Sequence, residues 1–162
     1  MVTNLLSEKK KQNTLSSREL KQTVETFQLE VERLHASKEF TESLESLAKG
    51  ASDLIFNDFI IQLEVSQEFD SEQCIQKYGE VLKIVKLILQ SLSWSLAGGE
   101  KDLLDEYILS GFSELLKTLE HSSIWYIEAL KYVKAHHGLT GEPAHQMNTL
   151  IDYLINAFKQ AT

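Results

Sequence analysis

The sequence predicts an all-α fold, and two features of the chain support this prediction. Proline occurs once in 162 residues and glycine seven times, and long stretches without these two residues favour helices because both interrupt regular structure. Between these interruptions, apolar residues recur at spacings of three and four, which is the repeat of one helix face. A chain of this length is expected to form a single domain, residues 1–162.

The first helical patterns lie near the N-terminus. A short amphipathic segment covers about residues 3–13. Ser16 and Glu19 then have the spacing of a capping box, in which each side chain bonds the other residue's backbone amide, with Leu15 and Leu20 at the spacing of a hydrophobic staple. The helix that follows has one apolar face, formed by Leu20, Val24, Phe27, Val31 and Leu34.

Two further helices are predicted in the middle of the chain. One covers about residues 38–58, and the segment 59–72 either continues it or turns away. The other runs from about Glu72 to Ala97, where Gly98 and Gly99 are expected to end it. Its apolar face is wide, which is typical of a helix that is covered on several sides.

Three more helices complete the prediction. One spans about residues 101–120. The next begins at a cap, Ser122 or Ser123, and ends near His137, where Gly138 is expected to take the left-handed conformation that often follows a helix. The last begins near Pro143, because proline is favourable in a first helical turn.

Helices of unequal length without a sustained heptad repeat favour a globin-like helical stack over a regular four-helix bundle. We expect a globin-like core over residues 16–160 and an N-terminal helical arm over residues 1–15.

Composition excludes several classes of protein. The net charge of −8 is unfavourable for binding nucleic acid, which needs a basic surface. The single cysteine, Cys74, cannot form an intramolecular disulfide or a thiolate zinc site, and it fits a reducing compartment. The chain contains no run of about 20 apolar residues, so no membrane insertion is expected. It also has no signal-peptide core, so we expect a cytoplasmic protein.

The run WYIEALKYVKAHHGL, from Trp125 to Leu139, resembles the matching stretch of phycocyanin α subunits. Asp105–Tyr107 upstream and Ile151–Tyr153 downstream fit the same pattern at the right spacing. The resemblance covers nearly the whole chain, with about one residue inserted after Gly99, and it identifies the chain as a member of the phycobilisome protein family. It implies a globin-like fold whose N-terminal helices dock onto a β subunit. It also implies a linear tetrapyrrole, phycocyanobilin, joined to a cysteine by a thioether.

The chain departs from the family at the chromophore site. The resemblance places Glu80 at the position of the bilin cysteine. Leu82 stands where the family has an arginine that holds a bilin propionate, and Lys83 where it has an aspartate that accepts hydrogen bonds from the pyrrole N–H groups. A thioether needs sulfur, and a lysine offers only donors. We therefore expect no covalently bound cofactor.

Part of the chromophore pocket remains in the sequence. Tyr107, Trp125 and Tyr126 match aromatic residues that line the bilin in the family, so they form either a residual pocket for a non-covalent bilin or ordinary core packing. Cys74 precedes Glu80 by six residues, which is about 9 Å along a helix. It is either a substitute attachment point or a buried, idle thiol.

The residues that pair subunits in the family have also changed. Lys9 stands where phycocyanin α subunits have an aspartate, and Leu89 where they have an arginine. In the family, that aspartate and that arginine each form an ion pair with the β subunit. A reversed charge facing an arginine disfavours the ordinary partner. We expect a partner interface that includes Lys9, Leu15, Leu20 and Leu89, with a homodimer, a β-like subunit or another phycobilisome component as partner.

Neither a catalytic nor a metal site is expected. His136 and His137 are adjacent, so on a helix they point about 100° apart. The helix 72–97 contains no histidine for a haem iron, and we find neither a Ser-His-Asp spacing nor a glycine-rich phosphate loop.

The expected function is that of an unpigmented relative of phycocyanin α that acts through protein–protein contact in the assembly, turnover or regulation of phycobilisomes, at the cytoplasmic face of thylakoids. One alternative is a non-covalent bilin carrier or sensor. Another is an enzyme acting on bilins, such as a lyase, although no proton-transfer pair is evident.

Overall fold

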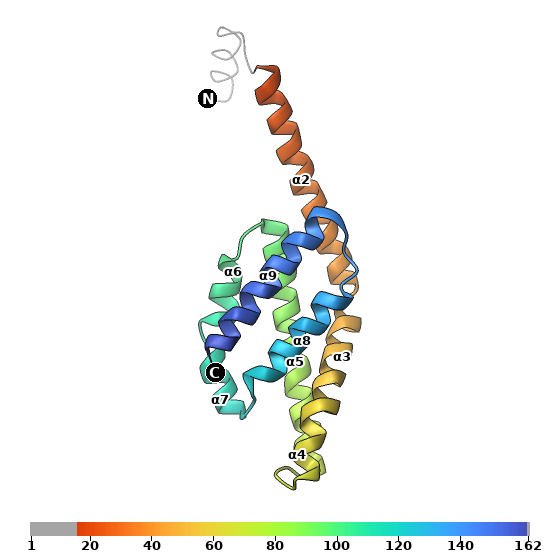
Figure 1. The fold of residues 1–162 in the computed structure, drawn as a ribbon, viewed down its shortest axis with the longest axis vertical. Coiled ribbons are helices and arrows are strands. Elements are labelled where there is room, and N and C mark those ends of the chain that lie inside the picture. Colours follow the sequence, from red (N-terminus) through yellow and green to blue (C-terminus); the bar gives the residue numbers. More distant parts are fainter. Residues whose placement is uncertain (1–15, 162) are drawn as a thin grey trace. The chain divides into compact units, whose positions relative to one another are not determined.

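The computed structural model describes residues 16–161, and every regular element in this range is a helix (Figure 1). This confirms the all-α prediction. The chain divides into two compact units, Met1–Glu32 and Arg33–Thr162, which we describe separately. The arm predicted over residues 1–15 lies outside the described residues, so its boundary stays a prediction.

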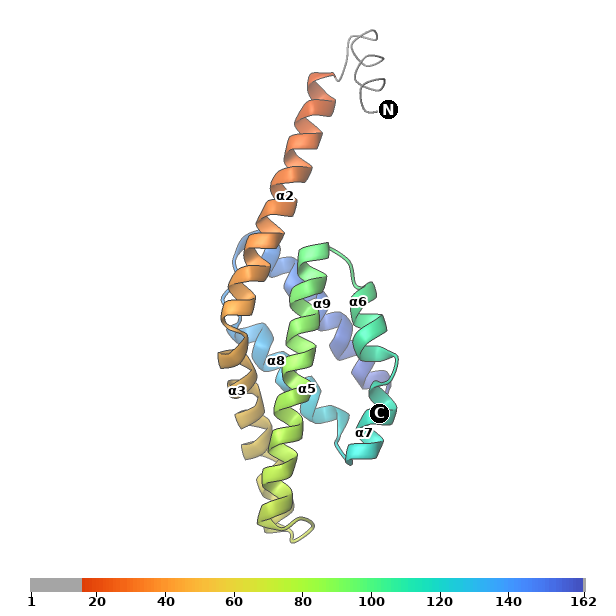
Figure 2. The same ribbon diagram turned by 180° about the vertical axis from the view of Figure 1, so that it is seen from behind.

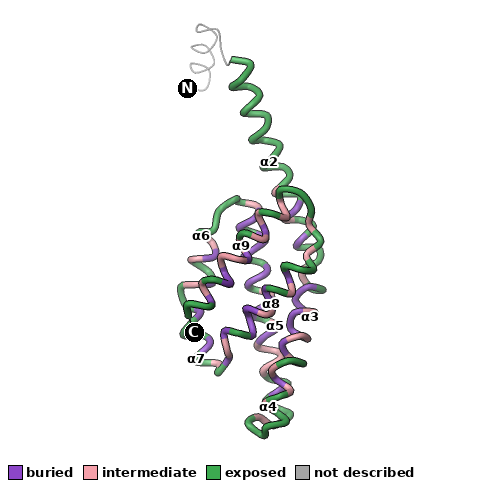
Figure 3. The backbone as a smooth tube through the Cα atoms, in the orientation of Figure 1, coloured by how far each residue is buried: buried purple, intermediate pink, exposed green. Residues whose placement is uncertain are grey.

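The first unit contains the beginning of α2 (Ser17–Glu42). The predicted capping box is confirmed: the Glu19 amide donates to Ser16 Oγ over 3.1 Å, and the Ser16 amide donates to Glu19 Oε2 over 3.3 Å. The apolar face predicted for this helix is exposed to solvent (Figure 3). Leu20 is 54% exposed and Phe27 65%.

In the second unit, the predicted boundary between the first two helices is wrong. α2 continues to Glu42 and α3 (Leu44–Ile55) follows after Ser43, whereas the sequence suggested a helix from about 38 to 58. The end of α2 is tied to α5 by hydroxyls, because Thr41 Oγ1 lies 2.8 Å from Ser93 Oγ. The chain then continues helically through η1 (Phe56–Ile60) and α4 (Ile61–Val65), so segment 59–72 begins by continuing the helix.

The long helix α5 (Ser71–Gly98) agrees with its prediction to within one residue at each end. A capping box between Asp70 and Gln73 starts it, with the Gln73 amide donating to Asp70 Oδ1 over 2.7 Å. Gly99, with φ of 72°, ends it in the left-handed conformation that glycine adopts without strain.

The helix predicted over 101–120 is instead three shorter elements: α6 (Asp102–Leu104), η2 (Asp105–Leu109) and α7 (Phe112–Leu119). η2 is a π-helical turn, which the three-and-four spacing of apolar residues does not distinguish from an α-helix.

The last two helices are close to their predictions. α8 (Ser123–His136) is capped by Ser122, whose Oγ accepts from the Ile124 amide over 3.3 Å. Gly138 has the expected positive φ, 71°, and α9 (Gly141–Gln160) has Pro143 in its first turn.

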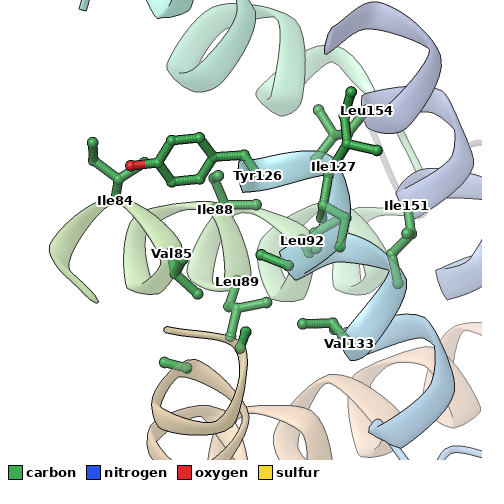
Figure 4. Packing of buried hydrophobic residues seen from close by; sticks show 14 of the residues in the cluster. Ile84, Val85, Ile88, Leu89, Leu92, Tyr126, Ile127, Val133, Ile151 and Leu154 are labelled. Carbon is green, nitrogen blue, oxygen red and sulfur yellow. The ribbon is translucent and has the colours of Figure 1, made fainter. Parts of the chain in front are cut away.

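α5 is the central helix of the second unit and packs against α3, α6 and α9, while α8 packs against α3 and α9 (Figures 1 and 2). The core lies between these helices. Its side chains include Leu89 and Leu92 of α5, Val133 of α8 and Ile151 of α9 (Figure 4).

Among the described helices, α5 alone is long and apolar enough to cross a membrane by length and composition. This is weak evidence for a membrane span, because the buried helix of a soluble protein's core meets the same criterion. In this structure α5 is the central helix of the second unit, and more than half of its most apolar stretch is buried.

Candidate functional site

The candidate site lies where the first half of α5 faces the loop before α8 and the first turn of α8. Glu80 lies four residues after Gln76 and three after Lys77 on α5, so both side chains can reach it from the same side of the helix. His121 is in the loop between α7 and α8, and Tyr126 is in α8. Two segments that are distant in sequence therefore meet at this site, since His121 is 41 residues from Glu80 but only five from Tyr126.

Glu80, His121 and Tyr126 form a hydrogen-bonded chain that leads into the core. Glu80 Oε2 lies 2.7 Å from His121 Nε2, and His121 Nδ1 lies 2.7 Å from the Tyr126 hydroxyl. The Glu80 side chain is 19% exposed, the His121 side chain is 0% exposed, and Tyr126 is fully buried. The chain therefore starts near the surface at Glu80 and ends at a buried phenol.

The protonation states follow from the surroundings. Burial raises the pKa of Glu80, but hydrogen bonds from His121 and Gln76 and the charge of Lys77 outweigh burial, so the pKa falls below its usual value. Burial, together with the charge of Lys77, lowers the pKa of His121 below its usual value, although Glu80 acts to raise it. Burial and the charge of Glu80 raise the pKa of Tyr126.

These pKa shifts favour one arrangement of protons among the three side chains. Glu80 is ionised and His121 is neutral, so His121 Nε2–H donates to the carboxylate. His121 Nδ1 then carries a lone pair and accepts from the Tyr126 hydroxyl. In this hydrogen-bonded chain each donor therefore faces an acceptor.

Both oxygens of Glu80 are occupied. Gln76 Nε2 donates to Oε1 over 3.1 Å, and Lys77 Nζ lies 3.6 Å from Oε2. Lys77 also donates to the carbonyl of Leu119 at the end of α7. Glu80 therefore links α5 to the loop before α8, as a satisfied structural carboxylate.

Trp125 and Tyr126 are part of the core. Trp125 is 5% exposed, and its ring centroid lies 5.0 Å from that of His121. The Tyr126 ring packs edge-on against Phe112 at 5.6 Å and extends toward Ile84 of α5 (Figure 4). These contacts favour core packing over a residual ligand pocket for Trp125 and Tyr126.

Tyr107 lies apart from these two residues. It is 53% exposed on η2, and its ring meets Trp94 edge-on with 6.2 Å between centroids. It lines an apolar groove of about 290 Å³ whose other walls include Leu87 and Phe112. As the structure describes it, this groove is not lined by Trp125 or Tyr126, so of the two alternatives for these aromatic residues the contacts favour core packing for Trp125 and Tyr126 and a surface groove for Tyr107.

The other predicted site residues are divided between the surface and the core. Leu82 is partly buried and Lys83 is exposed. Leu89 is fully buried, on the α5 face that also carries Val85 and Leu92 (Figure 4), so it offers no surface to a partner and its assignment to the interface is wrong. Leu20 is exposed. Lys9 and Leu15 lie outside the described residues.

Cys74 is 1% exposed. Its thiol lies 3.7 Å from the carbonyl oxygen of Ile60, and burial raises the pKa of the thiol. A buried thiol that keeps its proton is a poor nucleophile, which disfavours Cys74 as an attachment point.

The sequence analysis did not assign His121, Gln76 or Lys77 to this site, and His121 is the buried one of the three. Its sequence neighbours carry only a weak signal, because a histidine next to a helix cap is most often a surface residue. Its partner Glu80 is 41 residues away, and only the folded chain brings the two together. Within residues 16–161, no group of three histidine, cysteine or acidic side chains is placed to hold a metal ion.

Comparison with known proteins places the chain in a family. A family model described as "Phycobilisome protein" matches residues 5–158. The phycoerythrocyanin alpha chain of Nostoc sp. strain PCC 7120 is 28% identical over 144 residues, covering 88% of each chain. The C-phycoerythrin alpha chain of Synechocystis sp. strain PCC 6701 is 26% identical over 146 residues, covering 88% of this chain and 87% of the relative. The globin-like stack predicted from the sequence is confirmed at the level of this family.

Proposed function

The chain belongs to the phycobilisome protein family, and from this we propose that it is an α-chain-like member that carries no covalent bilin and acts through contact with other proteins. The observation that carries the proposal is the state of Glu80, the residue at the chromophore-bearing position by resemblance. A carboxylate has no sulfur for a thioether, and this one is fully engaged with His121, Gln76 and Lys77.

The hydrogen-bonded chain supports the proposal in a second way. It is a set of polar groups that satisfy one another in the absence of any ligand, and such a network stabilises a closed arrangement. A ligand entering beside Glu80 would have to break the bond to His121 and leave buried polar atoms unpaired, which costs about 1–3 kcal/mol for each group.

Contact with other proteins is supported by the exposed apolar face of α2. Leu20, Val24, Phe27 and Val31 are each between 47% and 65% exposed. A contiguous apolar stripe on a soluble protein marks a surface for association. We propose a second copy of the chain as the first candidate partner and a dedicated β-like subunit or another phycobilisome component as the next.

Sizing the purified protein by analytical ultracentrifugation, alone and mixed with phycocyanin β, tests this choice. Self-association predicts a dimer that ordinary β does not dissociate. Tight one-to-one binding to ordinary β would contradict the proposed change of partner.

A second candidate function is non-covalent binding of a bilin, which the apolar groove beside Tyr107 favours. Visible absorbance separates the two functions after co-expression with a phycocyanobilin pathway. A visible band that co-purifies and is released by denaturation supports the carrier, whereas its absence supports the first proposal. We propose no enzymatic activity, and we place the protein in the cytoplasm beside thylakoids, as its family implies.

A further inference from the structure

The exposed face of α2 has the repeat of a coiled coil. Every position from 16 to 32 is exposed (Figure 3), and the buried residues of this helix, Ala36 and Phe40, come after that stretch. Large apolar residues follow one another on α2 at steps of four, three, four and three: Leu20, Val24, Phe27, Val31 and Leu34. Each is between 47% and 65% exposed. This is the a and d pattern of a heptad repeat, with the two valines at a and the other three residues at d.

The apolar repeat ends within α2 on both sides. The preceding a position is Ser17 and the following one is Lys38, and both are polar and exposed. The next d position is Thr41, which contacts α5 because its Oγ1 lies 2.8 Å from Ser93 Oγ. The apolar seam from Leu20 to Leu34 therefore covers about two heptads, which is enough for a weak association between helices.

The residue types along this seam favour a pair of parallel helices. β-branched residues at a, combined with leucine at d, favour two strands in parallel coiled coils. Both a positions of α2, Val24 and Val31, are β-branched, and two of the three d positions, Leu20 and Leu34, are leucine. Phe27 is the middle d residue and adds the largest apolar side chain. In a parallel, in-register pair, each of these residues packs against the same residue of the other helix.

The residues beside the seam fit the same orientation. In a parallel pair, a g residue of one helix lies across from the following e residue of the other, and such pairs set the orientation. Glu30 at g thus faces His35 at e, and Thr23 at g faces Gln28 at e. His35 Nε2 lies 3.0 Å from Glu39 Oε1 of its own chain, but the His35 side chain is 72% exposed, so its other ring nitrogen is open to a second partner. An antiparallel pair brings g residues together, and Glu30 would then lose His35 as its partner.

We propose that two copies of the chain associate through α2 as a parallel, in-register, two-stranded coiled coil from Leu20 to Leu34. This inference rests on the self-association proposed above and adds its orientation and register. Val24 of each copy packs against Val24 of the other, and Glu30 of each copy contacts His35 of the other. Because the seam is short, we expect a weak dimer with a Kd on the order of 10 μM.

Disulfide trapping in the full-length chain tests the orientation. Leu20→Cys places a thiol at the first layer of the seam, where a parallel dimer brings the two copies of this position together and an antiparallel dimer separates them. Mild oxidation is therefore expected to give a covalent dimer on a non-reducing gel. Gln22→Cys is the matched control, because this exposed position lies on the opposite side of α2 from the seam, and it is expected to stay monomeric on the gel. The wild type has only Cys74, which is 1% exposed, and is also expected to stay monomeric there.

Variants of His35 test the register by sedimentation equilibrium. His35→Lys places a permanent positive charge across from Glu30 of the other copy and is expected to tighten the dimer about threefold, as exposed ion pairs do. His35→Glu places like charges across the seam and is expected to weaken the dimer by about the same factor. Equal dimer affinity in these two variants would overturn the proposed register.

The failure of this inference is distinguishable from the failure of self-association. A wild-type chain that stays monomeric at every concentration reached would overturn both. A wild-type dimer whose Leu20→Cys and Gln22→Cys variants are trapped equally, or not at all, would overturn the parallel coiled coil alone and leave association through another arrangement.

Discussion

Glu80 occupies the position that the resemblance assigns to the chromophore, and its neighbours explain how a carboxylate is accommodated there. The sequence identifies the missing sulfur but gives no partner for the charge. His121 supplies that partner from the loop between α7 and α8, and the Tyr126 hydroxyl completes the hydrogen-bonded chain. A pairing between residues so distant in sequence depends on how the helices pack, so local patterns cannot predict it.

Replacing Glu80 by alanine is expected to lower the free energy of unfolding by about 1.5–3 kcal/mol, because it removes a hydrogen bond between a charged group and a buried imidazole. Urea unfolding of both variants measures this. Glu45→Ala is the matched control, since Glu45 is 78% exposed in its pair with Lys86 and such pairs contribute about 0–1 kcal/mol. Equal losses of unfolding free energy in the two variants would show that the hydrogen bonds of Glu80 contribute no more than an exposed ion pair.

The same residues are expected to make stability depend on pH. Folding lowers the pKa of His121 from 6.5 and that of Glu80 from 4.5, so the unfolded chain binds more protons in acid. Stability from His121 is complete above pH 6.5 and is lost as pH falls from there toward its lower folded pKa. Stability from Glu80 is complete above pH 4.5 and is lost below it.

The variant Glu80→Gln/His121→Gln should therefore lose less stability than the wild type between neutral pH and pH 4.5. The measurement is urea unfolding at several pH values, read as the difference between the two proteins. Parallel curves would contradict the assigned protonation states.

At the scale of the elements, α3 and α8 pack closely where Gly50 of α3 lies against Tyr132 of α8. A Cβ at Gly50 would overlap the ring and hydroxyl of Tyr132 on α8. Gly50→Ala is expected to destabilise the protein by about 1–3 kcal/mol, the usual cost of overpacking, and Tyr132→Leu in the same chain should restore part of it.

Gly79 is the matched control for this prediction. It lies inside α5 with nothing within 4 Å of its added Cβ, so Gly79→Ala is expected to stabilise by about 0.5–1 kcal/mol through helix propensity. Thermal unfolding compares the two. If Gly79→Ala lowered the stability as much as Gly50→Ala, the loss at Gly50 could not be attributed to overlap with Tyr132.

The apolar face of α2 gives the second prediction for an element. Phe27→Glu is expected to abolish the proposed association by placing a charge on the stripe, while leaving the melting temperature of the monomer unchanged because Phe27 is 65% exposed. Gln22→Glu, an exposed position on the opposite side of α2 from the stripe, adds the same charge and serves as the control. Sedimentation velocity decides: a dimer that survives Phe27→Glu would remove α2 from the interface.

Sequence patterns predicted some elements better than others, for physical reasons. The ends of α5 and α8 were predicted because capping side chains and left-handed glycines act locally. The segment 101–120 was predicted as one helix because a π-helical turn keeps nearly the same apolar pattern. The division of α2 from α3 was missed because Ser43 carries no strong stop signal and tertiary bonds from Thr41 help to fix the end of α2.

For the whole molecule, the sequence sufficed for the fold class and the family, because both depend on patterns spread over most of the chain. The site was less predictable. Aromatic residues that match a pocket in relatives, such as Tyr107 and Tyr126, are separated here into a surface groove and a buried core. A match of residue types therefore did not imply a shared cavity.

The central claim is that this phycobilisome-family chain carries no covalent chromophore. The direct test is the intact mass of the denatured protein after co-expression with a phycocyanobilin pathway and bilin lyases, beside Cys74→Ala. We predict the unmodified mass for both proteins, since Glu80 has no sulfur and the Cys74 thiol is 1% exposed. An added bilin mass on the wild type would contradict the account, and its loss in Cys74→Ala would identify Cys74 as the attachment point.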